Sequence, residues 1–152
     1  MSVDAVLAGL ERAEPAALAR AISLVENRRD GFEQVLSRLH RRAGRARRIG
    51  ITGPPGAGKS TLVDGMVRVF RTADLKVAVI AVDPTSPFTG GALLGGRIRM
   101  ESVSLDPGVF IRSMATRGAL GGLATTTEEV ADVLDAYGFD RIIVETVGVG
   151  QA

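Results

Sequence analysis

Apolar residues recur every three or four positions in the N-terminal third of the chain, which is the spacing of one face of a helix. Pro15 suits the first turn of a helix, and Asp30-Gly31 marks a break. The pattern predicts three helical stretches, at residues 3–10, 15–25 and 32–39. Residues 1–46 are therefore predicted to form a helical N-terminal extension.

After residue 46 the pattern changes to short apolar runs that alternate with helical spacing. Continuous apolar runs suit the strands of a parallel sheet that is covered on both faces. Strands are predicted over residues 49–52, 77–82, 109–112 and 141–144, and helices over 59–71 and 125–137. In the second helix, Thr125 is the expected cap, with Glu128 and Glu129 in the first turn. This alternation predicts an α/β fold: a three-layer domain over 47–152 with a mainly parallel sheet.

Residues 53–61 read G-P-P-G-A-G-K-S-T and match the full phosphate-binding loop pattern G-x-x-x-x-G-K-[ST]. A strand before the loop and a helix after it are the context that this pattern requires, so the domain is predicted to be a P-loop NTPase. Its glycines let successive backbone N–H groups point toward an anion. Lys59 can reach the β- and γ-phosphates, and the Ser60 hydroxyl can ligate Mg²⁺. The predicted nucleotide-binding residues are Gly53, Pro54, Pro55, Gly56, Ala57, Gly58, Lys59, Ser60 and Thr61.

Two acidic residues that follow apolar runs are candidates for the metal site and for catalysis beside Lys59. Glu145 ends the last run, where a Walker B acid holds Mg²⁺ directly or through water. Asp83 ends the second run, and its carboxylate would face the phosphates if that strand lay beside the one before the loop. The alternative for Asp83 is a turn-starting residue before Pro84, and both remain open. The predicted metal ligands are thus Ser60, Asp83 and Glu145, and Gly148 could offer its N–H to a γ-phosphate.

Composition narrows the class of protein. The 152 residues suffice for one domain, with 45% hydrophobic and 24% charged residues, as in ordinary globular proteins. Aromatic residues make up only 4% and the net charge is +2, which argues against nucleic-acid binding. The chain has no cysteine, no basic leader and no apolar run of membrane-spanning length. We therefore expect a cytoplasmic protein that contains no disulfide, binds no nucleic acid and does not associate with a membrane.

Several segments beyond the phosphate loop resemble the MeaB/ArgK family of GTPases, which are related to the human methylmalonic aciduria type A protein. These segments are residues 79–86, 89–91, 99–100, 110–113 and 144–151, the last of which reads V-E-T-V-G-V-G-Q. The resemblance covers nearly the whole chain. It implies a GTP-hydrolysing metallochaperone, with Mg²⁺ as cofactor, that helps to load adenosylcobalamin into methylmalonyl-CoA mutase or a related acyl-CoA mutase. It also implies a homodimer in the full-length family.

The chain departs from this family in two respects. Gly96 stands where the family carries an acid, which puts hydrolysis in question, and the guanine-reading N-K-x-D motif does not occur in the sequence. We therefore expect a truncated chain, and two alternatives remain: a non-catalytic nucleotide-binding fragment, or an ATP-dependent small-molecule kinase. No acceptor pocket for a kinase can be located. Slow intrinsic turnover is expected, because neither an arginine finger nor a matching glutamine is evident.

Overall fold

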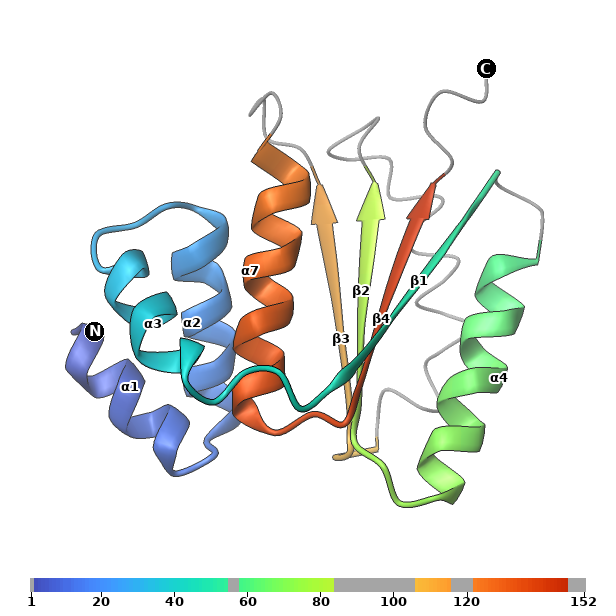
Figure 1. Ribbon diagram of the computed structural model, residues 1–152, viewed down its shortest axis with the longest axis horizontal. Coiled ribbons are helices and arrows are strands. Elements are labelled where there is room, and N and C mark those ends of the chain that lie inside the picture. Colours follow the sequence, from blue (N-terminus) through green and yellow to red (C-terminus); the bar gives the residue numbers. More distant parts are fainter. Residues whose placement is uncertain (1, 55–57, 84–105, 116–121, 148–152) are drawn as a thin grey trace. The chain divides into compact units, whose positions relative to one another are not determined.

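The computed structural model describes residues 2–54, 58–83, 106–115 and 122–147 (Figure 1). Its helices and strands are α1 (Val3–Glu11), α2 (Pro15–Glu26), α3 (Phe32–His40), β1 (Arg47–Gly53), α4 (Lys59–Thr72), β2 (Val77–Asp83), β3 (Val109–Ala115), α7 (Gly122–Tyr137) and β4 (Arg141–Val147). They belong to two compact units, one of residues 1–46 with 124–139 and the other of residues 47–123 with 140–152. Among the described helices, none has the length and apolar character needed to cross a membrane.

The second unit is built on four parallel strands in the order β1-β4-β2-β3, which confirms the α/β fold with a parallel sheet. β4 comes last in the sequence but pairs with both β1 and β2. The sequence-based prediction required β2, which ends at Asp83, to lie beside β1, which precedes the phosphate loop. This condition is wrong, because β4 lies between the two strands. The burial of the strands explains this order. Ile142 and Ile143 of β4 are fully buried, whereas every second residue of β1 is exposed, as at the border of a sheet.

All four strands share one register, so their carboxyl ends meet at the same edge of the sheet. Gly53 at the end of β1 lies opposite Val147 of β4, and Val82 of β2 lies opposite Thr146. Asp83 then lies opposite Ala115, the last residue of β3. In open parallel sheets, ligands bind outside this edge, so the register places the predicted site residues where a ligand is expected.

Helix α4 covers one face of this sheet. Its Val63 and Val67 are fully buried and pack with Val79 and Ile143 of the central strands. Burying one side chain of this kind stabilises a fold by about 1.5–3 kcal/mol. Because these two valines are four residues apart, they lie on the same face of the helix, and this face fixes α4 along the sheet.

The first unit is helical and contains α1, α2, α3 and most of α7. The Ser2 side chain caps α1 by accepting a hydrogen bond from the Ala5 N–H at 3.2 Å. The buried residues of these helices share an apolar character: Val6, Leu10, Leu18, Ile22, Val25, Val35, Leu39, Val130, Val133 and Leu134. Each helix presents them on one face, so the predicted helical periodicity of the N-terminal segment holds in the structure.

The start of α7 differs from the sequence prediction. The helix begins at Gly122, so Thr125 is not its cap, and no acidic residue lies in its first turn. Glu129 instead forms an ion pair with Arg28 at 2.5 Å, and Arg28 also donates to the Thr126 hydroxyl at 3.3 Å. Capping signals are local and weak, whereas this helix is held by tertiary contacts of its side chains, which explains the wrong boundary.

A buried carboxylate in the first unit fixes the segment that leads into β1. Asp135 of α7 is only 3% exposed. Its two oxygens accept hydrogen bonds from the N–H groups of Gly44 at 2.8 Å, Arg45 at 3.1 Å and Ala46 at 3.1 Å. Three donors offset much of the cost of burying a charge, so this contact defines the conformation of the residues just before the strand.

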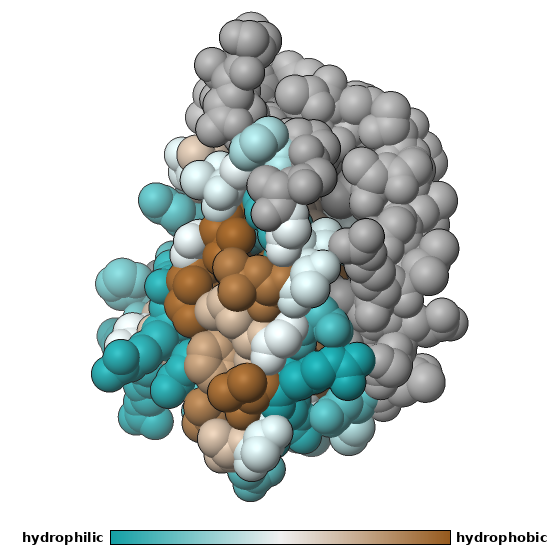
Figure 2. Space-filling view, turned by 90° about the vertical axis from the view of Figure 1, so that its right-hand side faces the viewer, coloured by the Kyte–Doolittle hydropathy of each residue, from teal (hydrophilic) through white to brown (hydrophobic). Residues whose placement is uncertain are grey.

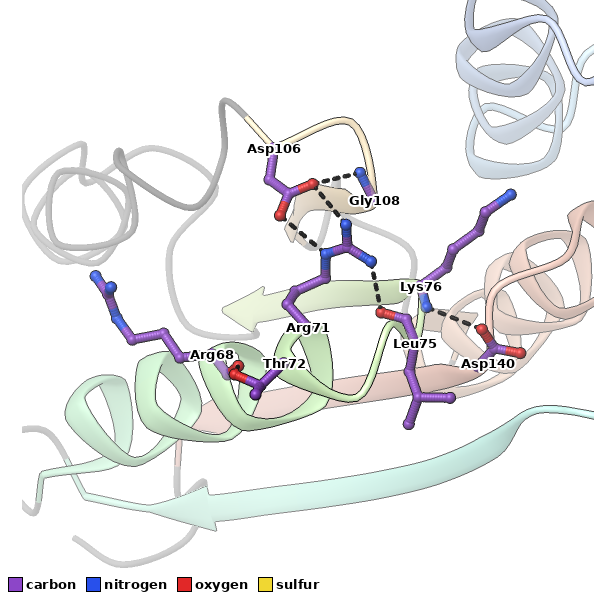
Figure 3. Close-up of polar contacts among 8 residues, drawn as sticks. All are labelled: Arg68, Arg71, Thr72, Leu75, Lys76, Asp106, Gly108 and Asp140. Carbon is purple, nitrogen blue, oxygen red and sulfur yellow. Dashed lines mark hydrogen bonds and ion pairs between the residues drawn. The ribbon is translucent and has the colours of Figure 1, made fainter.

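A second polar contact closes the end of the sheet opposite the predicted site (Figure 3). Arg71 of α4 forms a bidentate ion pair with Asp106, with both N–O distances 2.9 Å, and donates to the Leu75 carbonyl at 3.0 Å. The N–H of Gly108 donates to Asp106 at 2.8 Å. A Cβ at Gly108 would overlap the Arg71 guanidinium, so a larger residue here would displace this side chain from its ion pair. The contact joins the end of α4 to the turn that starts β3.

Asp106 is expected to make stability depend on pH. The hydrogen bond from Arg71, and then that from the Gly108 N–H, lower the pKa of Asp106 below its ordinary value of 3.8. Because the folded-state pKa is the lower one, the stabilisation is fully present above pH 3.8 and disappears as the pH falls through the folded-state pKa. We expect Asp106→Asn to lower the Tm near neutral pH and to matter less in acid.

The measurement is thermal denaturation of both proteins between about pH 7 and about pH 3. Glu33→Gln, which changes an exposed acid of α3, is the control. A Tm difference between wild type and Asp106→Asn that stays constant over this range would contradict the assignment.

Candidate nucleotide-binding site

The structure describes both ends of the loop between β1 and α4, but not its middle. Pro54 follows β1 and Gly58 precedes α4, whereas Pro55, Gly56 and Ala57 lie outside the described residues. Gly58 has a left-handed backbone with φ +86°, and no atom lies within 4 Å of where its Cβ would be. Backbone geometry, and not lack of space, therefore favours glycine at this position.

The N-terminus of α4 carries the features of an anion site. No side chain caps it, and its first turn contains no acidic residue. The helical hydrogen bonds start with the Leu62 N–H, which donates to the Gly58 carbonyl at 3.0 Å. The N–H groups of the preceding turn have no acceptor within a helix, and the helix dipole adds partial positive charge at this end. A phosphate is a suitable ligand for such an end.

Lys59 connects this helix end to the neighbouring strand. Its Nζ donates a hydrogen bond to the Thr146 carbonyl of β4 at 2.8 Å. Thr146 follows Glu145 directly, so the contact brings the loop lysine to the part of β4 that carries the predicted acid. The sequence did not predict Thr146 as a partner. The acceptor is a backbone carbonyl, which every residue has, so no side-chain pattern marks it.

Glu145 of β4 pairs with Ile51 of β1 on one side and with Ala81 of β2 on the other. Ile143, two residues earlier, packs in the cluster beneath α4. Side chains two apart on a strand share a face, so the half-buried Glu145 lies on the face that α4 covers. Ser60 in the first turn of α4 is half-buried as well. Hydroxyl and carboxylate oxygens are the ligands that Mg²⁺ prefers, and this donor set fits that ion.

The other predicted site residues are only partly described. The backbone of Asp83 ends β2, two residues after Ala81 and thus near the same edge as Glu145, but β4 lies between β2 and β1. Gly148 and Gly96 lie outside the described residues. Within the part of the chain that the structure covers, no three His, Asp or Glu side chains form a cluster that could hold a metal ion.

Comparisons with known proteins agree with the loop and the fold. The model of the family described as methylmalonyl Co-A mutase-associated GTPase MeaB matches residues 18–152. A relative from Pyrococcus abyssi is 56% identical over 149 residues, covering 98% of this chain and 46% of the relative. GTPase ArgK of Escherichia coli is 43% identical over 147 residues, covering 94% and 44%, respectively. The methylmalonic aciduria type A homolog of Mus musculus, named as mitochondrial, is 38% identical over 164 residues, covering 99% and 40%.

A solved structure shows the same fold. The crystal structure of a LAO/AO transport system kinase superposes with a TM-score of 0.76 at 33% sequence identity, covering 98% of this chain and 44% of that chain. The chain thus spans about half the length of the curated relatives that it matches, from 40% to 46% of those named here.

Substitution of Gly58 tests the left-handed start of α4. Alanine in this conformation costs roughly 1–2 kcal/mol, so we expect Gly58→Ala to lower the free energy of unfolding by about that amount. The matched control is Gly65→Ala in the same helix, where nothing lies within 4 Å of the added Cβ. Alanine is favoured over glycine inside a helix by up to about 1 kcal/mol, so the control should be stabilised. Urea denaturation measures both, and shifts of the same sign would contradict the assignment.

Proposed function

The chain belongs to the MeaB family of methylmalonyl-CoA mutase-associated GTPases, and we propose that it binds GTP through residues 53–61 and hydrolyses it. The observation that carries the proposal is the hydrogen bond from Lys59 at the start of α4 to Thr146, the residue after Glu145. It brings a phosphate-binding cation, an uncapped helix end and an acidic strand end to one edge of the sheet. The names of the family and of its relatives support GTP as the nucleotide.

Phosphate binding on this site exchanges one contact of Lys59 for another. The ammonium donates to a neutral carbonyl in the structure, and a triphosphate offers it charged oxygens, which form stronger hydrogen bonds. The loop N–H groups and the N-terminus of α4 would hold the β- and γ-phosphates. The remaining loop residues, from Gly53 to Thr61, would surround the same phosphates, and Gly148 would offer its N–H to the γ-phosphate.

We assign Mg²⁺ to the Ser60 hydroxyl and the Glu145 carboxylate, with Asp83 as a further ligand. The ion would neutralise the charge that builds up on the phosphates. Hydrolysis itself is attack of water on the γ-phosphate, with guanosine diphosphate as leaving group. The residues of this chain contribute by positioning: Lys59 holds the phosphate tail, while Glu145 and Asp83 orient the metal shell. Without a contributed arginine, turnover should be about 10⁻⁴ per second, as in unassisted small GTPases.

The partner in this proposal is an adenosylcobalamin-dependent acyl-CoA mutase, which the chain would serve as a metallochaperone. The description of the family and the name of the mouse relative support this partner. Co-purification with a purified mutase, with and without GTP, tests it directly. The cytoplasmic location and the homodimer expected from the sequence stay predictions.

Nucleotide binding is tested with Lys59→Ala. A hydrogen bond to a charged group is worth about 1.5–3 kcal/mol, so we expect GTP to bind roughly 10- to 100-fold more weakly. Isothermal titration calorimetry with GTP and ATP in the presence of Mg²⁺ measures this. Lys76→Ala is the matched control, because its exposed side chain lies at the other end of the sheet. Equal affinity of Lys59→Ala and wild type, or no heat with either nucleotide, would overturn the proposal.

The same preparation separates the alternatives. GTP-selective turnover supports the proposed GTPase. Binding without turnover identifies a non-catalytic nucleotide-binding fragment. ATP-dependent phosphorylation of a small molecule identifies a kinase, which is the kind of enzyme that the superposed LAO/AO transport system protein is named as.

The role of Glu145 is tested through the metal. If its carboxylate holds Mg²⁺, Glu145→Gln should raise the Mg²⁺ concentration needed for half-maximal turnover by about tenfold or more, since a neutral amide is a weaker ligand. Asp83→Asn, measured in parallel, shows which of the two acids contributes more to Mg²⁺ binding. Glu33→Gln again serves as the control that leaves the curve in place. An unchanged Mg²⁺ dependence of Glu145→Gln would remove this residue from the metal site.

A further inference from the structure

Residues 38–48 concentrate the positive charge of the chain. They contain six of the 19 Lys and Arg residues and no Asp or Glu. The rest of the chain is left with 13 basic and 17 acidic side chains, a net charge of −4. The small overall charge of +2 therefore hides a strongly basic stretch on an otherwise acidic protein. Like charges this close together repel one another, and a bound anion would remove that repulsion.

Four of these arginines belong to the helical unit and are exposed: Arg38, Arg41, Arg42 and Arg45. Among the described residues, no acid pairs with the side chain of Arg38, Arg41 or Arg45. Arg42 contacts Glu11 at 3.6 Å, and the two side chains are 52% and 60% exposed. An ion pair so open to water contributes little to stability. The four guanidinium groups are therefore available to an anion from outside the chain.

The dipole of α3 accounts for only the start of this arginine run. Arg38 lies in the last turn of the helix, where a positive charge is favourable. The helix ends at His40, and the dipole effect falls off within the last turn. Arg42 and Arg45 lie beyond that end, so helix stability does not explain their charge.

The backbone that carries Arg45 is held in one conformation by a buried anion. Asp135, which is 3% exposed, accepts hydrogen bonds from the N–H groups of Gly44, Arg45 and Ala46. Gly44 has a left-handed backbone with φ +104°, which favours glycine. The Arg45 backbone thus contacts the interior while the residue stays exposed. A binding surface whose backbone is already ordered loses less conformational entropy when a partner binds.

We propose that Arg38, Arg41, Arg42 and Arg45, which we call the arginine surface, bind an acidic peptide segment of a partner protein. The arginines recur every three or four residues, so their charges form a series along the chain. A guanidinium group donates two parallel hydrogen bonds to a carboxylate, which gives each contact a defined geometry. Arginine is also enriched in interfaces between proteins. Carboxylates presented by Asp or Glu side chains are therefore the ligands that this surface fits.

Two other kinds of anionic partner fit the surface less well. Residues 33–69 contain no aromatic side chain on which a nucleic-acid base could stack. A membrane-binding surface combines basic residues with apolar ones that enter the lipid. In the described part of the chain, the exposed large apolar residues are Leu62 and Val69 of α4, outside the arginine surface. Figure 2 shows hydrophobic side chains gathered in a strip on the side of the molecule where α4 lies.

Binding of fluorescein-labelled poly-L-glutamate, followed by fluorescence anisotropy at low ionic strength, tests the proposal. We expect the combined variant Arg38→Gln, Arg41→Gln and Arg45→Gln to bind at least about fivefold more weakly, because three exposed ion pairs are lost. The control combines Arg20→Gln, Arg29→Gln and Arg68→Gln, which remove the same charge from other exposed positions. Its affinity should stay within about twofold of wild type.

Asp135→Asn separates a fixed surface from simple charge. The substitution removes a negative charge, so net charge alone predicts tighter binding of poly-L-glutamate. The asparagine amide also brings a second donor to backbone N–H groups that need acceptors, which should loosen the segment and weaken binding. Weaker binding supports the proposal, and tighter binding contradicts it. Should circular dichroism show that this variant does not fold, the two combined variants decide.

Three results would overturn the proposal. The first is no binding of poly-L-glutamate to the wild-type chain, and the second is an equal loss of affinity in both combined variants. The third is tighter binding of a short DNA duplex, or of vesicles that contain phosphatidylserine, than of poly-L-glutamate, if that binding is lost in the arginine-surface variant. None of these measurements uses GTP, so their outcome is separate from that of the proposed GTPase.

Discussion

The insertion of β4 between β1 and β2 determines where each candidate site residue of this protein lies. Because the three strands are parallel and share one register, Gly53, Val147 and Asp83 come to one edge of the sheet. α4 starts at this edge and is fixed along the sheet by its buried valines. A phosphate site needs a helix end and an acidic strand end at the same place, and the pairing of β4 with β1 provides both.

The contact of Lys59 with Thr146 depends on this pairing as well. A lysine at the start of α4 reaches a β4 carbonyl only because β4 is the strand next to the loop. The Thr146 carbonyl accepts a hydrogen bond from the Lys59 ammonium, as a phosphate oxygen would. The fold therefore already orients this cation toward the candidate site. In the proposed function, a bound triphosphate would replace this neutral acceptor of Lys59 by a charged one. The Lys59 side chain would thus link the phosphate loop to the strand that carries Glu145.

The sequence was sufficient for features that depend on neighbouring residues. The phosphate loop, the helical spacing of residues 59–71 and the apolar runs of β2 and β4 are local patterns, and the structure contains an element at each. The order of the strands could not be derived from the sequence. β1 and β2 follow each other in the chain, yet β4 lies between them in the sheet, because the most buried strand takes the central place. The ion pair of Arg71 with Asp106 joins residues 35 apart, and the contacts of Asp135 with the Gly44 to Ala46 backbone span about 90 positions. Contacts between residues so far apart produce no periodic pattern in the sequence, so they could not be predicted from it.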